Sequence, residues 1–204
     1  KNAVVSYVEP YASSTCEMVA EILQYIVDKP KLKNIEADAM YSGILVDTDN
    51  FVIKAGVRTF EAAAFLRRAG ADVTRVRKMF REDMEHCRIR TAIINKAEIY
   101  MNEFAISTFD GANVSGATVV GAKAANALLN IQGIRGSFVL TSLQDCIYIS
   151  ARSIDELNVQ VIMEKFNGGG HLTMAAAQLK DVTLEEAKQQ LEDVLQQMRE
   201  DGDI

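Results

Sequence analysis

The sequence predicts an α/β protein in two units, with a mainly helical first part and a mixed α/β second part. Apolar residues at helical spacing fill roughly the first hundred residues, among alanine-rich and charge-rich stretches. Apolar runs typical of β-strands, bounded by turn residues, come after them. A chain of 204 residues is long enough for one domain or two small ones. We therefore expect two units with a boundary near residue 100.

The first part is expected to hold four helices. Ser14 and Glu17 have the spacing of a capping box, which marks the start of an amphipathic helix. The predicted helices cover residues 14–27, 35–45, 59–69 and 72 to about 100, and a loop is expected at 46–51. The later part of the fourth helix is expected to connect the two units.

The second part is expected to alternate strands and helices. Two apolar runs flank a short turn at Gln144-Asp145, which predicts a β-hairpin. Capping boxes at Ser153–Glu156 and Thr183–Glu186 mark two helix starts. Strands are predicted at 101–108, 136–140, 146–152 and 172–179, and helices at 115–129, 153–166 and from 183 onward.

Composition narrows the class of protein. With 49% hydrophobic and 25% charged residues the chain resembles an ordinary soluble globular protein. Its net charge of −6 argues against broad binding of long nucleic acid, which needs a basic surface. The three cysteines are far apart and form no CxxC pair, which predicts free thiols and no zinc or disulfide framework. The sequence contains no apolar run long enough to span a bilayer and no signal-peptide pattern.

A glycine run is the most informative local feature. Asn167 precedes Gly168, Gly169 and Gly170, and His171 follows at once. Because glycine has no Cβ, such a run lets backbone N–H groups approach an anion closely, and the histidine adds a donor or a titrating group. A glycine-rich helix end followed by a strand explains the same residues without a ligand. The residues alone leave both interpretations open.

Two arginines occupy positions that favour an anion. Arg152 ends a β-type run just ahead of a predicted helix start, where a guanidinium can fork onto a phosphate. Arg58 lies in a short loop before a helix N-terminus, and a solvated surface charge is the equal alternative there. His86, on a charged helical segment, is expected to be an exposed helical residue.

Asp47 and Asp49 follow an apolar segment and are candidate metal ligands. Carboxylate oxygens suit hard divalent cations such as Mg²⁺ and Mn²⁺, whereas an Asx turn between two helices explains the pair without a metal. Ser13, Ser14 and Thr15 can orient a phosphate or a metal shell, although helix capping accounts for Ser14 fully. A complete metal site needs more ligands than this stretch supplies.

Five segments, taken in order, carry a resemblance to a known family. They are residues 12–17 (ASSTCE), 43–48 (GILVDT) with Asn50-Phe51, 58–63 (RTFEAA), 150–153 (SARS) and 168–173 (GGGHLT). Together they resemble the DHH/DHHA1 phosphoesterases, nearest to the membrane-anchored bacterial cyclic di-AMP phosphodiesterases of the GdpP type. Each motif is weak alone, and five in order over essentially the whole chain are specific.

The resemblance implies a two-domain catalytic unit. A DHH domain binds two Mn²⁺ ions, which activate a water that opens cyclic di-AMP to pApA, and a DHHA1 domain holds the nucleotide. It implies the end of the DHH domain at residues 1–85, a helical linker at 86–100 and the DHHA1 domain at 101–204. It further implies a cytoplasmic catalytic part in a parent protein at the cell membrane, and it leaves a homodimer open.

The resemblance also assigns site residues. Asp47 matches the last metal-ligand aspartate of the DHH domain. Gly168, Gly169, Gly170 and His171 match the substrate loop of the DHHA1 domain. Arg152 is implied as a phosphate contact in the same half. No catalytic residue is assigned within this chain.

The sequence departs from the family pattern at two places. The usual four glycines begin here with Asn167, which tolerates the left-handed conformation. The Asp-His-His triplet that names the family is absent, so we expect a C-terminal part of the catalytic unit that is inactive as this fragment.

The alternatives are an oligoribonuclease of the nanoRNase type and a non-catalytic DHHA1 nucleic-acid-binding module, as attached to alanyl-tRNA synthetases. The lack of a basic surface disfavours the module.

Overall fold

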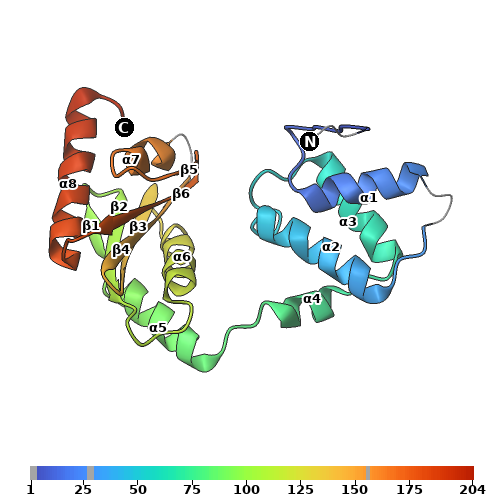
Figure 1. Ribbon diagram of the computed structural model, residues 1–204, viewed down its shortest axis with the longest axis horizontal. Helices are drawn as coiled ribbons and strands as arrows, with labels where there is room; N and C mark the ends of the chain where they lie inside the picture. Colours follow the sequence, from blue (N-terminus) through green and yellow to red (C-terminus); the bar gives the residue numbers. More distant parts are fainter. Residues whose placement is uncertain (1–3, 27–29, 155–156) are drawn as a thin grey trace. The chain divides into compact units, whose positions relative to one another are not determined.

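The computed structural model describes residues 4–26, 30–154 and 157–204. The chain divides into two compact units, one up to Arg81 and one from Glu82 onward (Figure 1). Each unit has its own apolar core. The mixed α/β fold class predicted from the sequence is confirmed, with a helical first unit and a sheet in the second.

The first unit is helical throughout its described secondary structure. Its helices are α1 (Thr15–Ile26), α2 (Asn34–Asp47), α3 (Val57–Arg68) and α4 (Val73–Met79). Their apolar faces meet around Ala20, Ile44 and Leu66, which are fully buried. Helix α1 packs tightly on α2 at Gly43, because a Cβ there would collide with Sγ of Cys16. The start of α1 is therefore held against the second half of α2.

The second unit is built on a six-stranded mixed sheet. Its elements, in chain order, are α5 (Met84–Asn95), β1 (Glu98–Tyr100), β2 (Phe104–Asp110), α6 (Ala117–Leu128), β3 (Gly136–Leu143), β4 (Cys146–Ser153), α7 (Val159–Glu164), β5 (Gly169–His171), β6 (Met174–Lys180) and α8 (Leu184–Asp201). The strand order is β1-β2-β3-β4-β6-β5, with β2 and β3 parallel and every other pair antiparallel. Helix α6 makes the crossover between the parallel strands.

Helices cover the two faces of this sheet unequally. Helices α7 and α8 share one apolar core with one face, where Phe138 and Ile149 are fully buried. Helices α5 and α6 cover the other face over the central strands (Figure 1), where the hydroxyl of Ser137 donates to the carbonyl of Ala125 at 2.7 Å. On that α6 side the outer strands β6 and β5 carry exposed residues. The sheet therefore offers an accessible surface beside α6.

Local signals predict most elements correctly. The Ser14 hydroxyl accepts a hydrogen bond from the Glu17 amide at 3.1 Å and caps α1. Thr183 and Glu186 form the complete capping box at the start of α8. The β3–β4 hairpin turns at Gln144, which has a φ of 56°.

The long helix predicted from residue 72 to about 100 is broken, and this prediction is wrong. Helix α4 ends at Met79, and α5 begins after Asp83, whose carboxylate accepts a hydrogen bond from the His86 amide at 2.8 Å. His86 itself is half-buried rather than exposed, and its Nε2 lies 2.9 Å from the carbonyl of Ser115. The break contains no glycine or proline, so the helical pattern runs through it.

The division between the units also lies earlier than the implied domain end at 85 and the implied linker at 86–100. Within that stretch α5 buries Ile93 in one core with α6, and β1 pairs with β2, so both elements belong to the second unit. The predicted capping box at Ser153 includes Asp155 and Glu156, which lie outside the described residues. Helix α7 begins later, at Val159.

Candidate functional site

Asp47 is the exposed last residue of α2, so it lies in the helix and not in the predicted loop. The turn after it is closed by Thr48, whose buried hydroxyl donates to the Ile44 carbonyl at 2.7 Å and accepts from the Phe51 amide at 2.9 Å. A side chain other than Asp47 therefore makes the turn. The Asp47 carboxylate is directed to solvent-accessible space, where an oxygen ligand for a hard cation is chemically suitable.

The first turn of α1 lies beside this carboxylate. Cys16, on that turn, packs against Gly43, one helical turn before Asp47. Burial raises the pKa of the Cys16 thiol, and the negative charge of Asp47 raises it further. The contact of Cys16 with Gly43, one turn before Asp47 on the same helix, places the thiol and the carboxylate in the same neighbourhood. The candidate metal ligand and the start of α1 thus share one small region of the first unit.

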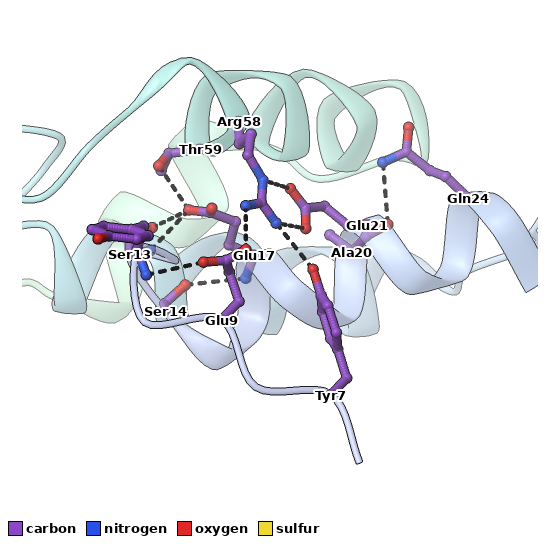
Figure 2. Close-up of polar contacts among 11 residues, drawn as sticks. Tyr7, Glu9, Ser13, Ser14, Glu17, Ala20, Glu21, Gln24, Arg58 and Thr59 are labelled. Carbon is purple, nitrogen blue, oxygen red and sulfur yellow. Dashed lines mark hydrogen bonds and ion pairs between the residues drawn. The ribbon is translucent and has the colours of Figure 1, made fainter. Parts of the chain in front are cut away.

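A buried carboxylate organises the loop before α1. Glu17 is 1% exposed and accepts hydrogen bonds from the amide of Ser13 at 3.2 Å, from the Ser13 hydroxyl, and from the Thr59 hydroxyl at 2.7 Å (Figure 2). The hydroxyls of Ser13 and Ser14 therefore both make hydrogen bonds within the first unit. The capping-box spacing predicts the Ser14 cap but gives no signal for the bond from Thr59, which is distant in sequence.

Arg58 joins α3 to α1 and to the segment before α1 inside the first unit. Its guanidinium bonds both oxygens of Glu21 at 2.7 and 2.6 Å, Glu9 at 2.9 Å and the hydroxyl of Tyr7 at 3.1 Å (Figure 2). These bonds, led by those to Glu21, raise the pKa of Arg58 above its usual range. Arg58 lies in the first turn of α3 rather than in the predicted loop, and the two carboxylates that pair with it balance the positive charge that an anion would need.

The glycine run forms both a helix end and a strand. Asn167 has a φ of 55°, and its amide bonds the Glu164 carbonyl at 3.0 Å. The Gly168 amide bonds the Met163 carbonyl at 2.9 Å, which completes the two-bond pattern of a Schellman cap. Asn167 thus takes the left-handed position, as its chemistry predicts. The residues that follow form β5 against β6.

The three glycines are not equivalent. A Cβ on Gly168 would collide with the carbonyl oxygen of Ala176, and one on Gly170 would collide with the carbonyl oxygen of Met174. Gly170 also has a φ of 156°. Gly169, by contrast, has open space where its Cβ would lie and is exposed. Gly168 and Gly170 are required by packing, whereas Gly169 leaves room for a ligand.

Strand register brings Arg152 and His171 onto one row. Arg152 on β4 pairs with Met174 on β6, and Met174 pairs with His171 on β5. Directly paired residues point to the same face of a sheet, and neighbouring strands lie about 4.8 Å apart. The backbones of Arg152 and His171 are therefore about 10 Å apart on the α6 side of the sheet. By the same register Gly169, opposite Ala176, lies on the next row of that face.

Arg152 is half-buried and held at the edge of α6. Its Nε donates to the side-chain oxygen of Asn126 at 2.8 Å, and a terminal nitrogen donates to the carbonyl of Ala151 at 2.8 Å. Asn126 is exposed on α6. Nothing in the sequence signals this pair, because its members lie on different elements.

Neither a preformed metal cluster nor a membrane span occurs in residues 4–26, 30–154 and 157–204. Among these residues, no three His, Cys, Asp or Glu side chains are arranged to hold a metal ion together. In the same part of the chain no helix combines the length and the apolar content that a membrane crossing requires.

Known proteins are similar to this chain over most of its length. Residues 104–200 match the model of the DHHA1 domain. The cyclic-di-AMP phosphodiesterase PdeA of Listeria monocytogenes is 48% identical over 189 residues, which cover 92% of this chain and 29% of that protein. The cyclic-di-AMP phosphodiesterase GdpP of Geobacillus thermodenitrificans is 44% identical over 200 residues, which cover 98% and 30%. The chain belongs to the DHH/DHHA1 phosphoesterase family.

The fold is also similar to that of a solved structure. An exopolyphosphatase-related protein of Bacteroides fragilis superposes with a TM-score of 0.85 at 21% identity, over 96% of this chain and 59% of that one. The chain spans about 30% of the length of the two curated relatives. In family terms, the row of Arg152 and His171 lies within the DHHA1 domain.

Proposed function

We propose that this chain is the C-terminal part of the catalytic unit of a phosphodiesterase that hydrolyses cyclic di-AMP to pApA. The relatives named above carry the phosphodiesterase activity in their names and cover nearly the whole chain. The observation that carries the proposal is the row on the α6 side of the sheet. It offers a guanidinium at Arg152, an imidazole at His171 and unobstructed backbone at Gly169 on one accessible face.

This face suits a phosphate group. The guanidinium of Arg152 supplies charge and paired donors, which match a phosphate better than a single ammonium does. His171 supplies a donor from the far side of the same row, across Met174. We infer that a phosphate above Met174, midway along the row, contacts both side chains. These residues then bind and orient the nucleotide, which is the share of the reaction assigned to the DHHA1 domain.

The first unit contributes to the metal centre. The exposed carboxylate of Asp47 fits one oxygen ligand of a hard divalent ion such as Mn²⁺. A two-metal centre would supply an activated water and stabilise the charge that develops on the phosphate. One aspartate cannot hold two such ions, so the 204-residue chain alone is predicted to be inactive. A membrane-anchored parent with a cytoplasmic catalytic part, and a homodimer, stay predictions of the resemblance.

The test uses the full-length protein with Mn²⁺ and cyclic di-AMP, and follows pApA by chromatography. Metal-dependent formation of pApA supports the proposal. A parallel assay with the 204-residue chain should give no pApA, and clear metal-dependent turnover there would contradict the assignment of Asp47 as a lone ligand. Short oligoribonucleotides belong in the same assay. Preferential cleavage of these would favour the nanoRNase-type activity, and binding without hydrolysis would favour a nucleic-acid-binding module.

A further inference from the structure

Asn126 is unusual on α6 because asparagine has a lower helix propensity than the alanines around it. The helix sequence, ATVVGAKAANAL, is rich in alanine, the best helix former. Asparagine is a poorer helix former, and here its side chain lies on the exposed surface, where it fills no core. Local rules are broken most often where a residue serves a function. The side-chain oxygen of Asn126 accepts the hydrogen bond from Nε of Arg152.

That contact fixes the direction of the Arg152 side chain. The bond to Asn126 and the bond to the Ala151 carbonyl use two different nitrogens of one planar group. Two such bonds determine the plane of a guanidinium. A long side chain that is ordered before binding loses less freedom when its ligand arrives. The pair therefore pre-organises Arg152 at the end of the row that His171 shares.

The chemistry of the partner is also informative. An amide holds the guanidinium without adding a negative charge beside it, whereas a carboxylate at the same place would repel an anion. Elsewhere in this chain Arg58 is held by the carboxylates of Glu9 and Glu21. The bond to Asn126 therefore orients the guanidinium of Arg152 without itself adding a negative charge.

We propose that Asn126 is a positioning residue, which orients Arg152 toward a phosphate of the nucleotide lying across β4, β6 and β5. This inference rests on the proposed function, since it needs a phosphate ligand on that face. Asn126 acts through Arg152 and does not itself contact the ligand. The loss of one such hydrogen bond should weaken nucleotide binding about three- to tenfold.

The experiment is a double-mutant cycle in the full-length protein. Asn126→Ala, Arg152→Ala and the double variant are compared with wild type by KM and kcat for cyclic di-AMP, by the Kd for pApA, and by Tm. Asn130→Ala is the matched control, because Asn130 is exposed just beyond the end of α6. Asn126→Ala is expected to raise KM and Kd about three- to tenfold, with Tm unchanged or higher because alanine favours the helix. Asn130→Ala should change neither constant.

The cycle separates positioning from other roles. In the Arg152→Ala background, Asn126→Ala should change KM and Kd less than about twofold, because its effect passes through Arg152. An equal loss in both backgrounds, no loss in either, or a loss that follows a fall in Tm would overturn the inference. Absence of turnover in the wild type would count against the proposed function, and the Kd for pApA would still read the coupling between the two residues.

Discussion

Arg58 in the first unit and Arg152 in the second occupy positions that the sequence treats alike, and the structure separates them. Arg58 is held by two carboxylates and a tyrosine hydroxyl, so its charge serves to join α1, α3 and the segment before α1. Arg152 is held by an amide and a backbone carbonyl at the end of an accessible row. Two carboxylates balance the charge of Arg58 inside the first unit, whereas the Asn126 amide orients Arg152 without itself adding a negative charge.

The same difference extends to the surroundings of each arginine. In the first unit the polar groups of Ser13, Glu17 and Thr59 are bonded to one another inside the fold. In the second unit His171 and Gly169 are exposed on one face of the sheet. Asp47 differs from these bonded residues, because it is exposed at the end of α2. We therefore expect ligand-related effects at Asp47 and along the row, and stability effects at Arg58.

The largest predicted effect is at Asp47. In the full-length protein Asp47→Ala should lower kcat by about a hundredfold or more, because a carboxylate ligand is removed, with a smaller effect on nucleotide binding. Asp49→Ala is the matched control and should be milder, since Asp49 lies in the turn beyond α2. The measurement is pApA formation at saturating Mn²⁺. Equal losses for the two substitutions would show that Asp47 has no special role.

His171 should come next. His171→Ala is expected to lower kcat/KM about ten- to a hundredfold, the worth of a hydrogen bond to a charged group. Tm should not change, because the side chain is exposed. Kinetics and melting are measured on the same preparation. Wild-type kinetics in a fully folded variant would remove His171 from the site and leave phosphate binding to Arg152.

The glycines allow packing to be separated from ligand approach. Gly168→Ala should lower the stability of the fold by about 1–3 kcal/mol, because the new methyl group meets β6. Gly169→Ala meets open space and should leave Tm near that of wild type while it raises KM. Measuring Tm and KM for both variants separates the effect on packing from the effect on substrate binding. A larger loss of stability at Gly169 than at Gly168 would contradict the close packing of Gly168 against β6.

The smallest expected effect on substrate is at Arg58. Arg58→Met should leave KM for cyclic di-AMP within about twofold and lower Tm, because exposed ion pairs of this kind contribute modestly to stability. Melting curves and KM measured together check this. A rise in KM without loss of Tm would mean that Arg58 meets the substrate, and the contrast between the two arginines would fail.

Sequence reasoning predicts the features that depend on neighbouring residues. The Ser14 and Thr183 caps, the turn at Gln144 and the left-handed Asn167 follow from local chemistry. The break before α5 is missed, because Asp83 caps a helix inside a continuous helical pattern without glycine or proline. Strand β5 is also missed, because its three residues are too few to show the alternation of apolar and polar side chains that marks a strand.

The candidate site is predicted only in part, for a physical reason. Asp47, Arg152 and the glycine run are recognised by residue type and order. The pairing of Arg58 with Glu9 and Glu21 depends on contacts between elements that no local pattern specifies. The bond between Asn126 and Arg152 arises from the packing of α6 on the sheet in the same way.

The most direct test observes both arginines in one experiment. In ¹H–¹⁵N spectra of the 204-residue chain, the Nε–H groups of Arg58 and Arg152 and the amides of residues 168–171 are followed while pApA is added. We expect shifts at Arg152, Gly169 and His171, with Arg58 unchanged. Shifts at Arg58 and along α1 and α3, with Arg152 and the glycine run unchanged, would contradict the claim that the row on the sheet binds the nucleotide.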